Sequence, residues 1–198
     1  MLGSLGVAAA LGIPLGVALV RMPRLRPFAM GLIAVGQTIP SLALLGFLLP
    51  LVGIGRTPAV LALILYALLP IARNTIAGLL SVPDTLQEAA DALGLSRRER
   101  LREIELPLAL PAIVAGLRIA AVSTAGTATI AAAIGGGGLG ELIFRGVATV
   151  NTRQILAGAI PAALIALLLD GGFAWIEERQ SRRWRARSRP DATGAGGG

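Results

Sequence analysis

Glu88-Ala89-Ala90-Asp91-Ala92-Leu93-Gly94, followed by Ile104-Glu105-Leu106-Pro107, is a polar stretch that lies between segments apolar enough to cross a membrane. A spanning helix needs roughly 20 mostly apolar residues, and runs of this kind stand on both sides of the stretch. Because charged side chains are costly inside a bilayer, we expect the stretch to lie outside it, tied at both ends to spanning helices.

The same stretch carries signals for two short helices joined by a turn. Two Ser/Thr-x-x-Glu boxes occur in succession, each able to cap a helix start. Gly94 is expected to end the first helix in the left-handed conformation, and Pro107 and Pro111 to keep the second from running on unbroken. The boxes pair Thr85 with Glu88 and Ser96 with Glu99, and the predicted helices cover about 86–93 and 97–105. We call this unit the elbow.

The composition places the elbow in a membrane protein. Of the 198 residues, 55% are hydrophobic and 15% are charged, far from the balance of an average soluble domain. The chain has no cysteine, histidine or lysine, which excludes disulfides, thiolate or imidazole metal sites and most general bases. A P-loop also needs a lysine. We therefore expect a chain that is not an enzyme and binds no cofactor or metal of its own.

The distribution of arginines predicts the topology of an all-α membrane protein with about five spans. Arginines gather after the first apolar segment, in the elbow and after the last segment. By the positive-inside rule the N-terminus is outside, and the elbow, about 80–110, and the basic, Gly-rich tail, 177–198, are cytoplasmic. The tail is expected to be solvated and partly disordered. The predicted spans, within a membrane domain of residues 1–176, are about 2–20, 28–50, 57–79, 111–134 and 154–174.

The elbow motif resembles the EAA loop of the permease subunits of binding-protein-dependent ABC importers, which has a Glu-Ala-Ala, a glycine and an Ile-x-Leu-Pro end at this spacing. Stretches at 37–41, 69–75, 106–111 and 134–140 further resemble the branch that imports glycine betaine, choline, carnitine and related osmoprotectants. The likeness covers about residues 2–176. Relatives usually carry an additional stretch before the first span, which leaves the outer end of that helix open.

The resemblance implies the fold of a type I importer permease in a bacterial cytoplasmic membrane, crossing it several times and paired with a second copy or a paralogue. It implies that the elbow docks on a separate cytoplasmic ATPase, which holds ATP and Mg, and that the external face meets an extracytoplasmic substrate-binding protein. In this reading Glu88 offers a charged contact, the alanines permit close approach and Gly94 sets the helix angle. The coupling residues are Glu88, Ala89, Ala90, Gly94, Ile104, Leu106 and Pro107.

Polar side chains inside the apolar segments are the candidates for a solute pathway, although hydroxyls in spans also bond carbonyls of their own helix. Arg73, Asn74 and Arg118 lie near helix ends, where structural pairing is favoured over substrate contact. Aromatic residues make up only 4% of the chain, so no cage for a quaternary ammonium is visible beyond Tyr66 and Phe47. The candidates are Gln37, Thr38, Ser41, Tyr66, Asn74, Ser123, Thr124 and Thr127, with Thr129 as a further hydroxyl.

Residues 135–140 formally match the G-x-G-x-x-G nucleotide motif, but they follow an apolar helix rather than a strand. We expect an external turn that leads into a short re-entrant helix near 139–148, without bound nucleotide.

Two alternatives stay open at this point, one of the same class and one of a different class. The permease could carry another small solute, such as methionine, taurine or ergothioneine, or the chain could be a membrane scaffold that binds an ATPase without transporting. The elbow also resembles the start of a helix-turn-helix, but a DNA-binding domain needs a third helix and a core of its own. We therefore expect membrane lipid around the chain and no nucleic-acid partner.

Overall fold

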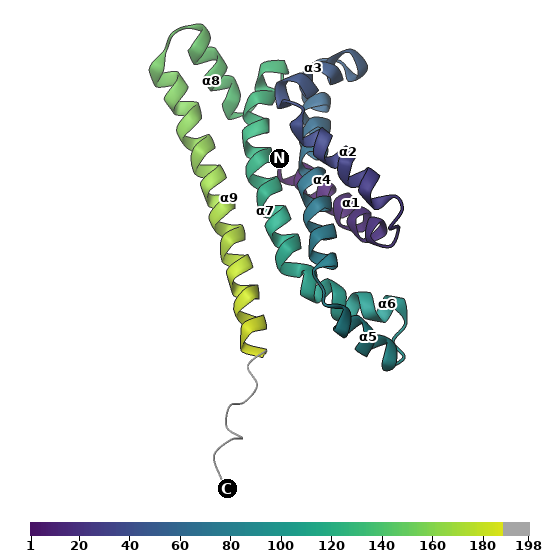
Figure 1. Cartoon of the computed structure of the whole chain (residues 1–198). Coiled ribbons are helices and arrows are strands. Elements are labelled where there is room, and N and C mark those ends of the chain that lie inside the picture. Colours follow the sequence, from purple (N-terminus) through teal and green to yellow (C-terminus); the bar gives the residue numbers. More distant parts are fainter. Residues whose placement is uncertain (188–198) are drawn as a thin grey trace.

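The computed structural model describes residues 1–187, with side chains described through Arg179, and this part of the chain contains helices and no strand. Two long helices, α4 (Arg56–Leu80) and α7 (Leu106–Ala131), pack side by side at the centre (Figure 1). Helix α1 (Leu2–Val20) packs on α4, and α9 (Thr152–Arg187) runs along α7. The other α-helices are α2 (Arg26–Thr38), α3 (Ser41–Val52), α5 (Asp84–Ala92), α6 (Arg97–Arg100) and α8 (Leu139–Ala148).

Small residues let the central helices approach closely. A Cβ atom added at Gly116 of α7 would lie 2.7 Å from the Cβ of Asn74 on α4, and one at Gly78 would lie 2.8 Å from the Cβ of Ala112. On its other side α4 meets Gly16 of α1, where an added Cβ would lie 2.7 Å from Thr75. Close packing of this kind holds helices together where lipid removes the hydrophobic driving force. The buried core beside it comprises Leu5, Ala8, Ala67, Ile71, Ala120 and Ala121.

The predicted membrane-spanning character is confirmed. Four described helices are long and apolar enough to cross a membrane: Leu2–Val20, Arg56–Leu80, Arg97–Ile134 and Thr152–Arg179. The bent pair of α2 and α3 raises the number to as many as five. Of the predicted spans, 2–20 and 57–79 agree with α1 and α4 within a residue or two.

The predicted span 28–50 is wrong as a single helix. It consists of α2 and α3, which meet at 97° with Ile39 and Pro40 between them. Pro40 has no N–H to continue the α2 hydrogen bonds, and its ring holds the chain extended, at φ −60° and ψ 137°. The Tyr66 hydroxyl of α4 donates to the Ile39 carbonyl that the break leaves exposed. We call this corner the α2–α3 bend.

The expectation that Pro107 and Pro111 would interrupt the second elbow helix is also wrong. Helix α6 continues through a π-helical segment, Leu101–Glu105, directly into α7, so that Arg97–Ile134 is one unbroken run. A π turn is wider than an α turn and makes room for the Pro107 ring in the first turn of α7. Pro111 lies inside α7. The elbow is thereby rigidly joined to a spanning helix.

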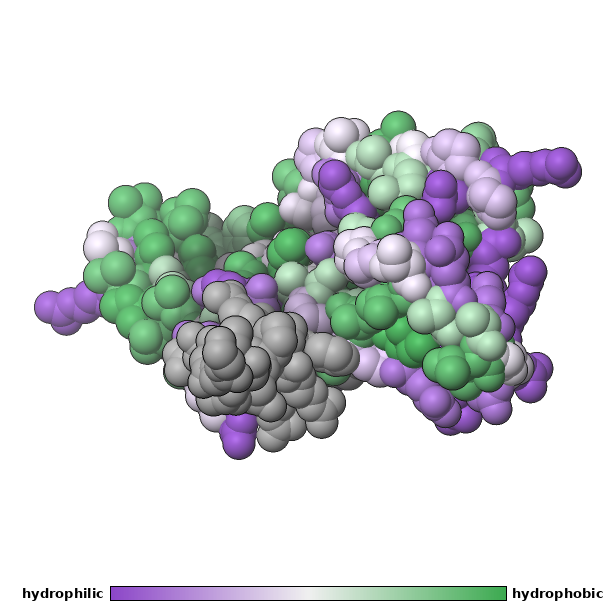
Figure 2. Space-filling model, turned by 60° about the horizontal axis from the view of Figure 1, so that its bottom comes forward, coloured by the Kyte–Doolittle hydropathy of each residue, from purple (hydrophilic) through white to green (hydrophobic). Residues whose placement is uncertain are grey.

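Helix α9 presents its apolar surface outward. Only 6% of its most apolar window is buried within the chain, and Leu164, Leu167 and Leu168 are largely exposed. Figure 2 shows hydrophobic residues along the left side and hydrophilic side chains gathered at the right, the side on which Figure 1 places the elbow. An apolar surface of this length suits contact with lipid or another helix.

The tail is helical over more of its length than expected. The predicted span 154–174 forms the middle of α9, which continues to Arg187. The part of the tail at 177–187 is therefore helical rather than disordered, while the prediction for 188–198 lies outside the described residues. The predicted short helix at 139–148 is confirmed as α8, which packs against α9 at the end of the molecule opposite the elbow (Figure 1).

Substitution of Gly140 is expected to prevent α8 from docking. A Cβ atom there would lie 2.0 Å from the Thr129 carbonyl oxygen, which is backbone and cannot move aside cheaply. Gly140→Ala should therefore lower the apparent melting temperature in detergent by several degrees or abolish recovery of monodisperse protein. Gly126→Ala is the matched control, because no atom lies within 4 Å of its added Cβ. Equal melting of the two variants would contradict this packing.

Candidate functional site

The turn of the elbow is a complete helix-ending motif. Gly94 has φ +74°, the left-handed conformation that the sequence predicted. The N–H of Gly94 donates to the Asp91 carbonyl at 3.0 Å, and the N–H of Leu95 donates to the Ala90 carbonyl at 3.1 Å. This pair of bonds defines a Schellman motif, which satisfies the last carbonyls of α5. The direction in which the chain leaves α5 is therefore fixed by the left-handed conformation of this residue, which favours glycine.

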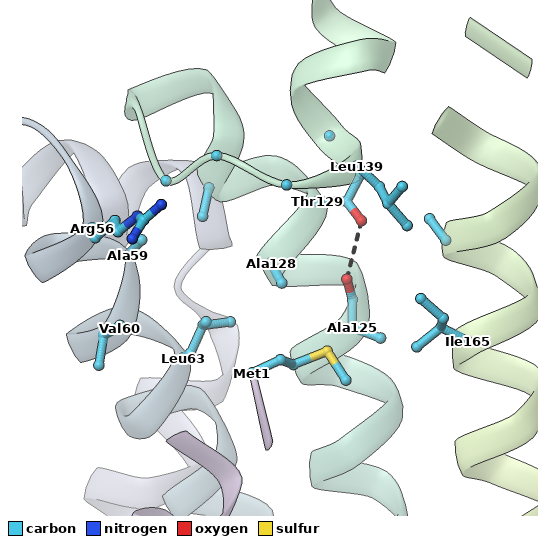
Figure 3. Close-up of a pocket in the computed structure, with 16 residues that line it drawn as sticks. Met1, Arg56, Ala59, Val60, Leu63, Ala125, Ala128, Thr129, Leu139 and Ile165 are labelled. Carbon is cyan, nitrogen blue, oxygen red and sulfur yellow. Dashed lines mark hydrogen bonds between the residues drawn. The ribbon is translucent and has the colours of Figure 1, made fainter. Parts of the chain in front are cut away.

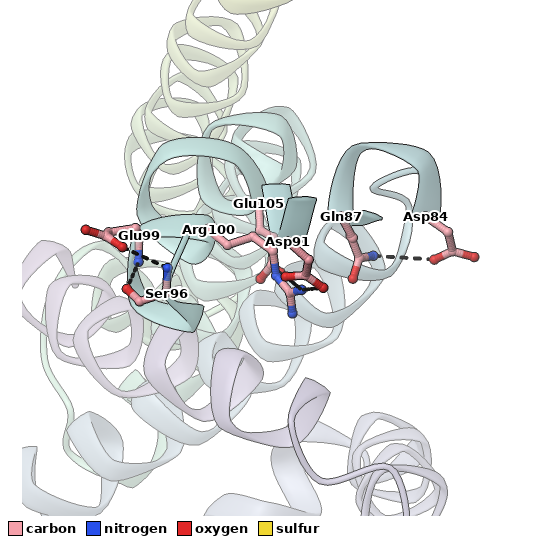
Figure 4. Close-up of polar contacts among 7 residues, drawn as sticks. All are labelled: Asp84, Gln87, Asp91, Ser96, Glu99, Arg100 and Glu105. Atoms are coloured by element: carbon pink, nitrogen blue, oxygen red, sulfur yellow. Dashed lines mark hydrogen bonds and ion pairs between the residues drawn. The ribbon is translucent and has the colours of Figure 1, made fainter. Parts of the chain in front are cut away.

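The start of α6 is capped as predicted, and the start of α5 is not. The Glu99 N–H donates to the Ser96 hydroxyl at 3.4 Å, and the Ser96 N–H donates to the Glu99 carboxylate at 2.8 Å (Figure 4). The box expected at Thr85 is wrong, because α5 already begins at Asp84, with Pro83 before it and no side-chain cap. Proline favours a helix start directly after it, which moves Thr85 inside the helix.

Arg100 ties the two arms of the elbow together. Its Nη1 donates to both carboxylate oxygens of Asp91 on α5, at 2.8 and 3.0 Å, and its Nε donates to Glu105 at 2.9 Å (Figure 4). Sequence reasoning did not single out Arg100, although Asp91 lies inside the motif. The angle between the arms is thus held by Gly94 and by the Arg100–Asp91 ion pair together, while the bond to Glu105 fixes the Arg100 side chain within its own arm.

The predicted coupling residues fall into three groups by exposure. Glu88, Ala89 and Gly94 are exposed on the outer surface of the elbow, next to Leu93, whose exposed fraction is 80%. Ala90 is buried, so its small side chain serves packing within the chain rather than approach to a partner. The remaining residues are half-buried where the elbow joins α7: Ile104, Leu106 and Pro107.

The capping box makes a prediction about pH. Hydrogen bonds from Ser96 hold the pKa of the Glu99 carboxyl below its usual range. A lowered pKa means that the box stabilises the elbow above the ordinary pKa and that this contribution is lost as the pH falls through the lowered value. Ser96→Ala should raise the Glu99 pKa toward its usual range, as followed by NMR of labelled glutamate in detergent. Ser81→Ala, at a hydroxyl bonded to Gly78 instead, should leave it unchanged; an unaltered pKa in Ser96→Ala would refute the box.

A polar groove of about 480 Å³ lies at the α2–α3 bend, between that corner and the central helices α4 and α7. It gathers all the candidate pathway residues named above except Asn74, Thr124 and Thr129. In the bend, the Arg73 guanidinium donates to the Gln37 side-chain oxygen at 3.2 Å. The groove is lined by Gln37, Thr38, Ile39, Pro40, Ser41, Tyr66, Pro70, Ile119, Ser123 and Thr127. We call it the bend groove.

The candidates outside the bend groove bond their own helices. Asn74 donates to the Pro70 carbonyl at 2.9 Å and packs against Gly116, and Thr124 is fully buried and donates to the Ala120 carbonyl. Thr129 donates to the Ala125 carbonyl at 3.1 Å and lines a different pocket (Figure 3). Phe47 is 68% exposed and does not line the groove.

That second pocket, of about 340 Å³, lies at the end of α7 near α8. Arg56 stands at one side beneath the glycine turn, and aliphatic side chains such as Leu63 and Ile165 form the rest of the wall (Figure 3). Gly135, Gly137 and Gly138 all have positive φ, so the turn follows a path that only glycine adopts readily. The turn leads into a helix rather than following a strand, as expected of a connecting segment.

Arg118 forms a forked ion pair with α9. Its Nε and Nη2 donate to the two carboxylate oxygens of Asp170 at 2.6 and 2.8 Å, and Nη1 lies 3.5 Å from Glu177. Sequence reasoning favoured a structural role for Arg118 but named no partner. The sequence signal that could have suggested a partner is Asp170, a carboxylate that stands alone within the apolar segment 154–174.

These features define a multi-pass membrane protein with a polar groove among its central helices and a charged helical elbow. The chain belongs to the family described as "Binding-protein-dependent transport system inner membrane component", which residues 8–185 match. Among its curated relatives, the "Glycine betaine/carnitine/choline transport system permease protein OpuCB" of Bacillus subtilis is 42% identical, over 87% of this chain and 82% of that protein. The "Osmoprotectant import permease protein OsmY" of Salmonella typhimurium is 45% identical, over 90% and 76%.

Solved structures agree on the fold. An inward-facing form of the MetNI methionine ABC transporter matches with a TM-score of 0.80 and 24% identity, covering 90% of this chain and 92% of that one. An amino acid ABC transporter solved with histidines matches with a TM-score of 0.68 and 20% identity. At these identities the likeness concerns the fold alone, and it confirms the predicted importer-permease fold.

Proposed function

We propose that this chain forms the passage for quaternary-ammonium osmoprotectants of the glycine betaine, choline and carnitine type. The observation that carries the proposal is the combination of a hydroxyl-lined bend groove with relatives at 42–45% identity whose names give these solutes. The groove lies between helices that span the membrane, as a passage requires. Uncharged hydroxyl and amide groups suit a small solute that has to enter and leave quickly.

The proposal includes docking of the elbow on a separate ATPase that holds ATP and Mg. The elbow exposes both Glu88 and the apolar Leu93, and it is continuous with α7 through the π-helical segment. A force applied to the elbow would therefore move α7 directly, because no flexible segment lies between them. The predicted roles of Glu88, Ala89 and Gly94 in coupling belong to this proposal. In it, Ile104, Leu106 and Pro107 form the rigid connection between the elbow and α7.

Two further partners follow from the proposal. The outward apolar surface of α9 suits a second permease, either another copy or a paralogue, with lipid around the rest. Helix α8 lies at the opposite end from the elbow, where we propose that a substrate-binding protein delivers the solute (Figure 1).

Uptake by cells tests the solute class. Cells that lack their own osmoprotectant importers, but produce this chain with its ATPase and binding protein, should accumulate labelled glycine betaine, choline or carnitine at high osmolarity. Accumulation of methionine, taurine or ergothioneine instead would retain the importer and reject the solute class. No accumulation of any solute, with the complex assembled, would favour the scaffold alternative.

Crosslinking tests the docking surface. Because the chain has no cysteine, Leu93→Cys introduces a unique thiol on the elbow. Paired with single cysteines placed around the ATPase, it should give a crosslink that depends on complex assembly. Val150→Cys is the matched control, because Val150 is 89% exposed but lies just after α8, at the other end. Crosslinking of the control and not of the elbow would reverse the proposed orientation.

A further inference from the structure

The bend groove has the chemistry of a contact site for a positively charged solute. Its side-chain oxygens come from Ser, Thr, Tyr and Gln. No arginine is among the described residues that line it, and the nearby Arg73 guanidinium is directed at the Gln37 oxygen, to which it donates at 3.2 Å. No aspartate or glutamate lines it either, so a cation would meet dipoles rather than a full negative charge. At about 480 Å³ the groove is within the usual size of small-molecule sites.

Tyr66 supplies the one aromatic face among the described residues that line the groove. Its hydroxyl donates to the Ile39 carbonyl of the bend, which fixes where the ring stands. The face of an aromatic ring attracts a quaternary ammonium through its quadrupole, to a distance of about 6 Å from the ring centre. Helix α2 ends at Thr38 and α3 begins at Ser41, so the negative end of one helix dipole and the positive end of the other meet at this corner, and the ring rather than the dipoles is the feature that favours a cation.

The position of the groove fits a passage. Tyr66 and Pro70 lie near the middle of α4, and Ser123 lies inside α7, with Thr127 one turn further toward the end of that helix at Ala131. Broken helices that meet near the middle of a membrane commonly contact the solute in transporters. One aromatic face holds a cation only weakly, and weak contact allows rapid release.

We propose that a quaternary-ammonium solute touches the permease in the bend groove, with its methylated ammonium group against the Tyr66 ring and the groove hydroxyls around it. This inference rests on the proposed function, because it concerns the path of the same solutes. It adds that the permease itself selects for the charged group, in addition to any choice made by a binding protein.

The test compares Tyr66→Phe with Tyr66→Leu in proteoliposomes that hold the ATPase and a saturating amount of binding protein. Phenylalanine keeps the ring and loses the hydroxyl, whereas leucine loses both. The maximal rate of choline uptake should fall about fivefold in Tyr66→Leu and by less than twofold in Tyr66→Phe, the scale of one partly hydrated cation–π contact. ATP hydrolysis stimulated by the binding protein should persist in both variants.

Control variants separate the effect of losing the Tyr66 ring from effects on packing and on the α2–α3 bend. Phe47→Leu removes an aromatic side chain outside the groove and should leave the rate unchanged. Tyr66→Met replaces the ring with a flexible apolar chain and repeats the test if leucine impairs folding. Two outcomes would overturn the inference. One is a wild-type rate in both the Phe and the Leu variant. The other is an equal fall in both, because the effect would then come from loss of the Tyr66 hydroxyl bonded to Ile39 and not from loss of the ring. Failure of the wild type to carry any of the three solutes would overturn the proposed function with it.

Discussion

Gly94→Val is expected to reduce solute uptake at least tenfold while the protein still inserts and purifies. The φ of +74° at Gly94 costs an ordinary L-residue about 1–2 kcal/mol, and a β-branched one more. Nothing lies within 4 Å of an added Cβ, so the strain is conformational and is relieved only if the turn rearranges. Rearrangement would alter the Schellman bonds and the angle between α5 and α6.

Gly94→Asn is the matched control for this prediction. Asparagine adopts the left-handed conformation more readily than other non-glycine residues, so uptake should be largely retained. Uptake and ATP hydrolysis are measured together in proteoliposomes. Loss of uptake with continued hydrolysis in the valine variant would place the defect at the coupling step. Wild-type uptake in Gly94→Val would show that the shape of the elbow is not required.

The Arg118–Asp170 ion pair is expected to give the largest effect on stability. An unpaired charge near the middle of a span costs about 2.5–3.5 kcal/mol. Arg118→Leu removes the partner of Asp170, whereas Asp170→Leu leaves Arg118 with Glu177, at 3.5 Å, as its remaining carboxylate. Arg118→Leu and Asp170→Leu should each lower the melting temperature in bilayer nanodiscs. The double variant removes both charges and should recover most of the loss, because apolar pairs replace buried ion pairs well.

Arg145→Leu is the control for the ion-pair prediction. It breaks the pair of Arg145 with Glu141 at 2.8 Å, which is exposed and joins neighbouring turns of α8. Pairs of this kind contribute only about 0.2–0.5 kcal/mol, so melting should hardly change. A double variant of Arg118 and Asp170 that is as unstable as the sum of its parts would contradict a direct pairing between α7 and α9.

Local signals in the sequence predicted the elements whose geometry is local. The left-handed Gly94, the Ser96 box and helix α8 depend on residues a few positions apart, and all three agree with the structure. The Thr85 box was wrong because a competing local signal, Pro83, starts α5 two residues earlier, at Asp84. Apolar length was enough to find the four long spanning helices, but it did not reveal that the segment 28–50 is bent into two.

Features that depend on contacts between distant residues were not predictable in the same way. Pro14, Pro70 and Pro161 lie inside intact helices, whereas Pro40 stands at a 97° bend. No pattern within the apolar run distinguishes Pro40, and the bond from Tyr66 to Ile39 that satisfies the bend comes from another helix. The passage of α6 into α7 through Pro107 likewise depended on a π turn without a sequence signature.

The candidate site shows the same division. Hydroxyl residues in the spans indicated a polar pathway, and most of them line the bend groove. Sequence alone could not exclude Thr124, because its exposure is decided by the neighbours of α7. The pairs that join Arg100 to Asp91 and Arg118 to Asp170 needed three-dimensional proximity to be recognised.

The central claim is that the chain passes an osmoprotectant through the membrane at the expense of ATP hydrolysed by a partner. Its most direct test measures ATP hydrolysis and accumulation of labelled glycine betaine in the same proteoliposomes. The ATPase faces the lumen, where ATP is enclosed, and the binding protein is added outside. We predict accumulation that requires both ATP and the binding protein. Hydrolysis stimulated by the binding protein without accumulation of glycine betaine, choline or carnitine would contradict the claim.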